Sequence, residues 1–176
     1  MPDTKPYAGA SNDRLTVLMN QDNGTNFVEG VDFTFGPVEA YNSAQNRNSR
    51  IKIIPTDTEQ YREVYVYYRR LPISILENLP EGFLDKVKIT TYPFTIHGIL
   101  ADINAALGLD LKPEEVQDET FTEARTQYPL QIVAGSLAWL PSVYNFKTAL
   151  EGVVLMEDGT AMLREDGLEV LLESAS

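Results

Sequence analysis

The sequence predicts an α+β protein built from two similar helix-plus-β-hairpin units and a C-terminal β-meander extension. Two observations predict this class: an amphipathic helical pattern is followed by alternating apolar runs, and that succession occurs twice. The third observation is a short string near the C-terminus that recurs every eight residues. The expected organisation is an extended N-terminal arm at 1–11, a first unit at 12–71, a connector at 72–91, a second unit at 92–150 and the β extension at 151–176.

The composition is that of a folded, acidic protein. Its 176 residues, 43% of them hydrophobic, suit one domain or two small ones. The net charge of −12 argues against a nucleic-acid partner, because binding to phosphates requires clustered Lys and Arg. No apolar run is long enough to predict a membrane span, and the first residues lack the apolar stretch of a Sec-type signal. The chain has no cysteine, so we expect neither disulfides nor thiolate metal sites.

In the first unit, a short helix is expected over residues 12–20, followed by turn chemistry at Gly24. Phe33 and Phe35 alternate with polar residues and predict a short strand. The polar stretch 39–48 is expected to be an exposed loop.

The strongest strand signal of the chain comes next. Residues 51–54 and 61–69 are rich in β-branched and aromatic side chains, and the short segment 56–60 between them can close a hairpin. Alternation in the second run predicts two faces, with Val64, Val66 and Tyr68 on one and Tyr65, Tyr67 and Arg69 on the other.

The clearest helical pattern covers residues 94–111, in the second unit. Thr95 is expected as its N-cap and Gly108 as the left-handed residue after its last turn. Its apolar stripe, at spacings of three and four, consists of Ile96, Ile99, Leu100, Ile103 and Leu107.

Short elements surround this helix. A strand is expected at 87–91 and one helical turn from Pro113. Two alternating runs, around 130–134 and 143–150, predict a second hairpin.

The two units can be aligned. Asn20 and Gly24 match Asn104 and Gly108 at an offset of 84. The hairpins match without gaps at an offset of 79, pairing Ile51 with Leu130, Ile53 with Ile132, Tyr61 with Leu140, Val64 with Val143, Tyr65 with Tyr144 and Tyr67 with Phe146. Duplication predicts this match, because side-chain parity is kept through both strands. The alternative is chance similarity of composition between two amphipathic α–β units.

The C-terminal segment repeats on a shorter scale. The strings LMEDG at 155–159 and LREDG at 163–167 are followed by VLLE at 170–173, which begins a third copy. Asp-Gly between apolar runs is a strong tight-turn signal, so three short strands are expected. Such a small sheet needs to pack on the body or on copies of itself, which suggests an oligomerisation device.

No group of residues predicts catalysis or metal binding. His97 is the only histidine, and a helix-end or solvent-facing role suits it better than that of a general base. Ser136 follows Gly135 but lacks the second glycine of a nucleophile elbow, so a turn is expected there. Asp158 and Asp166 do not have the spacing of a calcium-binding loop. We therefore expect no catalytic, metal or cofactor site and no enzymatic activity.

Interface candidates are the residues Trp139, Tyr144, Arg69, Arg70, Leu155, Leu163 and Leu171. Trp and Tyr are favoured as interface anchors, although core packing is the default interpretation for both aromatic residues. The two arginines lie in an acidic chain, either as solvated strand-edge residues or as partners for acidic neighbours such as the tail of another copy.

Several stretches of this chain resemble a domain found in structural proteins of large tailed bacteriophages. The first half matches in NQDNGTNF (20–27), NRNSRIKI (46–53) and YREVYVYYRRL (61–71), and the second in ILADINAALGLDL (99–111), EEVQDE (114–119) and AGSLAWLPSV (134–143). Relatives also end in strings of the type L-x-E-D-G. The likeness spans roughly residues 14–173, and one departure is the charged turn at 56–60, where relatives tend to be glycine-rich.

The resemblance implies a non-enzymatic virion component present in multiple copies and assembled in the host bacterial cytoplasm. Neck, tail or baseplate, and capsid decoration all fit. The expected partners are other virion proteins and further copies of the chain, with a trimer favoured, and neither nucleic acid nor membrane. The alternatives are a carbohydrate- or receptor-binding module of a phage tail or head fibre, using Tyr41 or Trp139, and a peptidoglycan hydrolase, which lacks a positioned acid and base.

Overall fold

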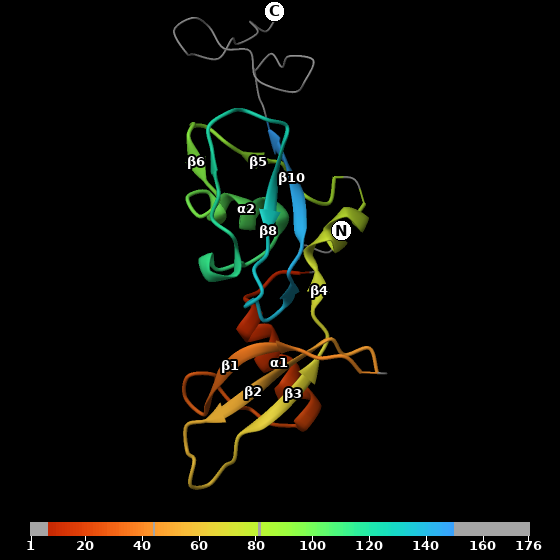
Figure 1. Ribbon diagram of the computed structural model, residues 1–176, viewed down its shortest axis with the longest axis vertical. Helices are drawn as coiled ribbons and strands as arrows, with labels where there is room; N and C mark the ends of the chain where they lie inside the picture. Colours follow the sequence, from red (N-terminus) through yellow and green to blue (C-terminus); the bar gives the residue numbers. More distant parts are fainter. Residues whose placement is uncertain (1–6, 44, 81, 150–176) are drawn as a thin grey trace, which may run out of the picture.

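A computed structural model describes residues 7–43, 45–80 and 82–149 of the chain. The fold is α+β, as predicted. Its helices and strands lie in two lobes along the long axis of the molecule (Figure 1). The first lobe comprises residues 11–70 and the second residues 71–149. Each lobe has its own cluster of buried apolar side chains.

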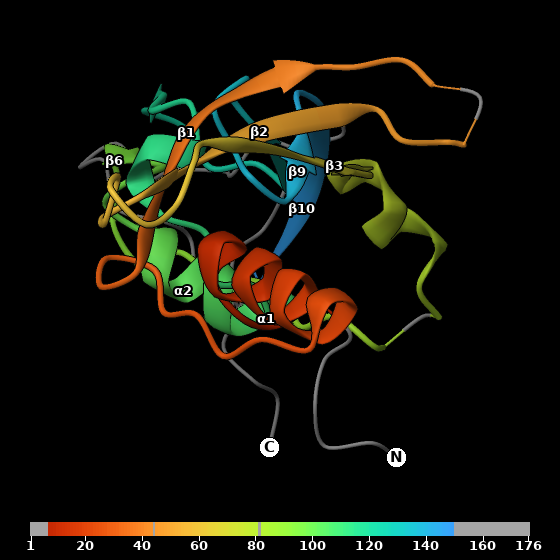
Figure 2. The same ribbon diagram turned by 90° about the horizontal axis from the view of Figure 1, so that it is seen from below.

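The first lobe consists of one helix on one antiparallel sheet. Helix α1 spans Ser11–Asn23, and the strands are β1 (Phe33–Ala40), β2 (Ser49–Pro55) and β3 (Val64–Tyr68), in the order β1-β2-β3. Helix α1 covers one face of this sheet (Figure 2). The hairpin expected at 51–69 is thus confirmed.

Alternation along β2 builds the core of the first lobe. Ile51 and Ile53 are buried under α1, whereas the alternate side chains of Arg50, Lys52 and Ile54 are half-exposed on the outer face. From the helix, Leu15 and Met19 lie in the same cluster, four residues apart and therefore on one face.

The second lobe places a shorter helix on a three-stranded sheet. Helix α2 spans Leu100–Leu107, and the sheet order is β5 (Val87–Lys88), β10 (Val143–Ala149), β8 (Gln127–Gln131). The hairpin strands β8 and β10 are antiparallel, and β5 joins β10 in parallel.

Several two-residue strands and two 3₁₀ helices complete the second lobe. Strand β4 pairs in parallel with β9, and β6 pairs with β7 in antiparallel fashion. The bounds of these elements are β4 Leu71–Pro72, β6 Phe94–Thr95, β7 Thr120–Phe121, β9 Trp139–Leu140, η1 Ile73–Asn78 and η2 Pro113–Glu115. Segment 71–88, which includes most of the expected connector, therefore belongs to the packing of the second lobe, because Ile73, Leu76 and Val87 are in its core.

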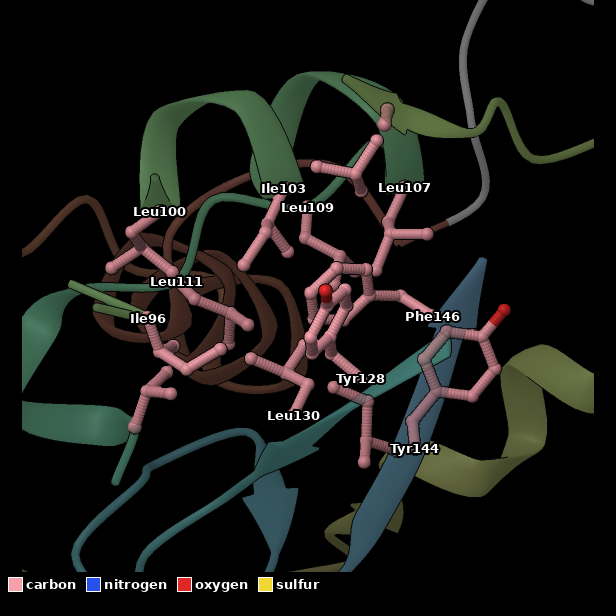
Figure 3. Close-up of a cluster of buried hydrophobic side chains, with 14 of the residues drawn as sticks. Ile96, Leu100, Ile103, Leu107, Leu109, Leu111, Tyr128, Leu130, Tyr144 and Phe146 are labelled. Atoms are coloured by element: carbon pink, nitrogen blue, oxygen red, sulfur yellow. The ribbon is translucent and has the colours of Figure 1, made fainter. Parts of the chain in front are cut away.

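The core of the second lobe is the larger of the two and is shown in Figure 3. Helix α2 directs Ile103 and Leu107 toward the sheet, where Tyr128, Leu130 and Phe146 are fully buried. Helix and hairpin therefore depend on each other for burial of their apolar faces.

The helix predicted over 94–111 is considerably shorter. Phe94 and Thr95 form strand β6, and the backbone N–H of Ile96 donates to the Glu119 carbonyl. Thr95 does not cap the helix; its hydroxyl accepts the N–H of Gly98 in a turn that precedes Leu100. Strand pairing with β7 uses the backbone groups of Phe94 and Thr95 that the predicted first helical turn would need. The apolar side chain of Ile96 is nevertheless buried in the core.

The expected C-terminal residue of this helix is correct. Gly108 adopts the left-handed conformation, with φ 64°, and its N–H donates to the Asn104 carbonyl. Gly24 ends α1 in the same way, with φ 64° and a bond to the Asn20 carbonyl. Glycine accepts this conformation without a Cβ penalty.

An asparagine side chain secures the chain after each helix. The Asn20 amide exchanges two hydrogen bonds with the backbone of Phe27, at 2.8 and 3.0 Å. The Asn104 amide exchanges two with the backbone of Leu111, at 2.9 and 3.0 Å. In each case the clamp joins residues seven positions apart.

The predicted gapless match of the two hairpins is wrong in the second strand. Ile51 pairs with Val66, whereas Leu130 pairs with Tyr144 rather than with Asn145. The second hairpin is therefore one residue shorter between its paired strands.

This shift reverses the faces of the matched aromatic residues. Tyr65 and Tyr67 are exposed, while their expected counterparts Tyr144 and Phe146 are buried. A one-residue slip moves a whole set of side chains to the other face of a strand.

Arg70 joins the two lobes. It is only 5% exposed and lies two residues after the end of β3, and its Nε donates to Ser49 Oγ of the first lobe at 2.7 Å. Its Nη1 donates to the carbonyls of Ala134, Ser136 and Trp139 in the second lobe, at 3.0, 2.9 and 3.3 Å. Burial lowers the pKa of the guanidinium, and the surrounding oxygens compensate for its lost hydration.

Glu115 makes the matching connection from the second lobe. Its Oε1 accepts the hydroxyls of Ser11, at the start of α1, and Ser136, at 2.5 and 2.6 Å. Its Oε2 accepts the N–H of Lys112 at 3.1 Å. Ser136 therefore has a structural role, since it also accepts the N–H of Trp139.

Replacing Arg70 by Lys should weaken this junction. Lysine keeps the charge but cannot span Ser49 and the three carbonyls with one nitrogen, so we expect a loss of about 2–4 kcal/mol in the free energy of unfolding. Urea denaturation followed by circular dichroism measures it. The control is Arg69→Lys at the exposed neighbouring position, with an expected change within about 0.5 kcal/mol. Equal small losses in both variants would contradict the junction role of Arg70.

Candidate functional site

Exposed apolar side chains concentrate on the first lobe. Among the described residues, all large hydrophobic side chains with substantial exposure belong to this lobe except Val143. They are Val17, Leu18, Phe27, Val28, Val31, Tyr61, Val64, Tyr65 and Tyr67. This lobe is therefore the part of the described chain in which an interaction site is expected.

Strand β3 supplies the most ordered part of this surface. It is an outer strand of its sheet, and in the described part of the chain no strand pairs with its far side. An open edge presents unpaired backbone N–H and C=O groups to any extended segment. Val64, Tyr65 and Tyr67 are exposed along it.

Tyrosines and cations alternate on the outer face of the same sheet. The guanidinium of Arg50 lies 4.7 Å from the centre of the Tyr65 ring, and the rings of Tyr41 and Tyr67 are 4.6 Å apart. Cation–π contact and ring packing hold this row in place.

The cations of this face are paired within the chain. Arg50 binds Glu39 at 2.6 Å, and Lys52 binds Glu63 at 2.9 Å. The hydrogen bond that Arg50 donates to Glu39 is the main cause that raises the pKa of Arg50, and the one that Lys52 donates to Glu63 does the same for Lys52. These pairs reduce the positive charge available to an acidic partner.

A broad hollow of 1010 Å³ lies next to β3, at the end of the first lobe. Its rim is formed by the loops that precede β1 and β3, and Phe27 and Tyr61 meet edge to face there, 6.3 Å between ring centres. Asp57 shapes the second loop, since its carboxylate accepts the N–H groups of Glu59 and Gln60. The hollow and the β3 edge together form what we name the docking surface.

Three of the predicted interface residues are not on the surface. Trp139 is 4% and Tyr144 8% exposed, both in the core of the second lobe. Arg70 is buried in the junction between the lobes. An interface role is therefore wrong for all three in the described fold, because each is already covered by its own chain.

Trp139 is also unsuitable as an exposed aromatic for sugar binding. Its ring packs edge to face against Tyr7, which comes from the expected N-terminal arm, with ring centres 5.7 Å apart. Tyr41, the other candidate, is half-exposed. Of the predicted residues, only Arg69 lies exposed beside β3, and Leu155, Leu163 and Leu171 lie outside the described residues, as does the whole expected β extension.

His97 has a structural environment. Its ring Nε2 is 3.0 Å from the Val116 carbonyl, and Nδ1 is 3.7 Å from the Asp118 carboxylate. Among the residues that the structure describes, no group of three His, Cys, Asp or Glu side chains could hold a metal ion. No described helix is long and apolar enough to cross a membrane.

Several important residues carried no sequence signal. Phe27 and Val31 come from loops without periodicity. Tyr61, expected in the strand run 61–69, lies in the loop before β3, and only folding brings the three residues to one hollow. Glu115 belongs to an acidic helical turn, and nothing in the sequence distinguishes it from Glu114 as a buried residue. The exception is β3, which was predicted by its alternating pattern.

Tyr68, at the end of β3, leaves its hydroxyl buried without a hydrogen-bond partner among the described residues. Burial raises its pKa to about 12, although the charge of Arg70 opposes the shift. The unfolded chain deprotonates tyrosine near pH 10, so this residue stabilises the fold below about pH 10 and loses that contribution as the pH rises to 12.

Tyr68→Phe should therefore lessen the loss of stability between pH 10 and 12. The decrease in slope stays below about 1.4 kcal/mol per pH unit, the limit for one proton, because solvent screens a partly exposed group. Urea denaturation across this pH range measures the slope. The control Tyr61→Phe, at an exposed tyrosine, should keep the wild-type slope. An unchanged slope in Tyr68→Phe would show that burial of this hydroxyl has no such effect.

No curated protein and no solved structure matches this chain. One family model matches residues 4–155, which is most of the sequence. The chain therefore belongs to a family of unknown function, DUF7941.

Proposed function

We propose that this protein is a non-enzymatic structural subunit of a bacteriophage particle, assembled in the host cytoplasm, that acts by binding copies of itself and other virion proteins. The sequence resemblance to phage structural proteins supports the virion role. The observation that carries the binding role is the docking surface: an open strand edge and an adjoining apolar hollow on one lobe. The proposal covers a position in the neck, tail or baseplate, or on the capsid surface.

The internal polar groups support a structural rather than a chemical role. Arg70 and Glu115 are buried, and each binds several groups of the chain itself. These bonds hold the lobes together and do not face the docking surface.

We further propose that the two lobes are copies of one helix-and-hairpin unit. The same asparagine clamp and left-handed glycine follow both helices, at the offset of 84. Alternate residues along β2 and along β8 and the residue after it are buried in matching positions at the offset of 79, with Ile51 on Leu130 and Ile53 on Ile132. The one-residue difference between the paired strands is then a deletion in the second copy.

If the lobes are copies, the two asparagine clamps should contribute similar amounts to the free energy of unfolding. Asn20→Ala and Asn104→Ala each remove two side-chain bonds to the backbone, so each should lower the free energy of unfolding by about 1–3 kcal/mol. Asn→Asp at either site keeps the acceptor and should cost less. Urea denaturation provides the values, with Asp110→Ala at an exposed site as the control. A loss at one clamp only would argue against equivalence.

We also propose that the C-terminal repeat at 151–176 holds copies of the chain together, with a trimer favoured. The proposal is motivated by the Asp-Gly turn signals, which recur between apolar runs at a spacing of eight residues. Such a sheet buries its apolar side chains only against another surface.

Light scattering after size exclusion tests this role. A chain that ends at Gly152 should have one third of the molar mass of the full-length protein at equal concentration, because the trimer contacts are removed. Circular dichroism controls for folding of the shortened chain. Equal oligomeric states for both chains would refute tail-mediated assembly, and glycan-array binding by such a protein would favour a carbohydrate-binding module instead.

A further inference from the structure

Strand β3 has a self-complementary sequence at an unpaired edge. From Glu63 to Arg69 it reads E-V-Y-V-Y-Y-R, with an acid at one end and a base at the other. The middle residue is Val66. Read in the opposite direction, this segment again places opposite charges at its ends and tyrosines between them.

From this we infer that β3 pairs with β3 of a second copy of the chain, antiparallel and with Val66 opposite Val66. The inference deepens the proposed function, on which it rests, because it names the partner of the β3 edge. In this register Glu63 of each copy lies opposite Arg69 of the other, at both ends of the pair. Opposite charges and aromatic pairs stabilise neighbouring positions of antiparallel strands.

The outer face gains the most from this pairing. Glu63, Tyr65, Tyr67 and Arg69 alternate with the inward residues and so share one face. Tyr65 of one copy then lies opposite Tyr67 of the other. Both tyrosines are exposed in the single chain, and pairing of the edges covers them.

Charge favours this register over its neighbours. Arg69 is exposed and forms no ion pair with another described residue, whereas Glu63 binds Lys52 at the surface and can share that contact. Centring the pair on Tyr65 or on Tyr67 would leave both charges opposite residues without charge. The two copies are related by a two-fold axis perpendicular to the sheet. A shift of the register by one residue is then excluded, because it would place inward-facing side chains of one copy opposite outward-facing side chains of the other.

The product is one continuous six-stranded sheet with both α1 helices on the same side. Six strands is an ordinary size for a sheet. An edge of five residues gives a small interface by itself, so the pairing gains from a second attachment between copies, which raises the effective concentration of the edges. Tail-held trimers linked through β3 would form a closed assembly of six chains, with the isologous contact on the two-fold axis.

Charge reversal in the full-length protein tests the inference by light scattering. Arg69→Glu and Glu63→Arg should each halve the molar mass, because like charges then face each other at both ends of the pair. The double variant restores opposite charges and should recover the wild-type mass. Arg47→Glu, at an exposed arginine outside both the pair and the hollow, is the matched control and should leave the mass unchanged.

The chain has no cysteine, so a single introduced thiol reports the register. Val66→Cys should form a disulfide-linked dimer on mild oxidation, because opposite Cα atoms in antiparallel strands are about 4.5–5.5 Å apart, within disulfide range. Val64→Cys, two positions from the centre, should not.

Three results would each overturn the pairing. The Arg69→Glu variant could keep the wild-type mass, the double variant could fail to recover that mass, or both cysteine variants could cross-link equally. The tail result is independent of these outcomes. A chain ending at Gly152 tests the tail through a threefold change in mass, whereas the edge variants test β3 through a twofold change. If the C-terminal repeat does not hold copies together, the masses of the β3 variants still test the strand pairing. If the β3 strands do not pair, the mass of the shortened chain still tests the C-terminal repeat.

Discussion

One buried arginine determines how the two lobes of this protein are joined. Arg70 lies two residues after β3, and its guanidinium donates to Ser49 on the first lobe and to three carbonyls on the second. A buried charge is tolerated only where polar groups replace its hydration. The arrangement of carbonyls around residues 134–139 is thus coupled to the end of β3. Glu115 completes the coupling, since it binds the start of α1 and the same turn.

The two lobes joined in this way differ in how they distribute their apolar side chains. The second lobe buries its aromatic residues, including Trp139 and Tyr144, in the larger core. The first lobe has a small core under α1 and leaves much of its apolar surface outside. In the proposed assembly role, the second lobe supplies the larger packed core and the first lobe the exposed apolar face. The strand β3 belongs to that face and ends at Tyr68, two residues before Arg70, so the docking surface lies close to the joint along the chain.

The one-residue difference between the hairpins separates their roles. In β10 the aromatic residues Tyr144 and Phe146 point inward, whereas in β3 the aromatic residues Tyr65 and Tyr67 point outward. The alternating sequences are similar, but opposite faces of the strands are buried. A register difference of one residue changes which face of a strand is buried, so aromatic residues lie on the surface in one lobe and in the core in the other.

The sequence alone determined the mixed class, the first helix, both hairpins and the two glycines that end the helices. These features follow from local periodicity and from backbone conformations that few residues accept. Tertiary structure decided the rest. The start of the second helix was lost to a strand pair between Phe94 and Phe121, because partners distant in the sequence competed for the same backbone groups. The faces of β10, the burial of Arg70 and the hollow around Phe27 were likewise set by contacts between distant segments, and local patterns carry no record of them.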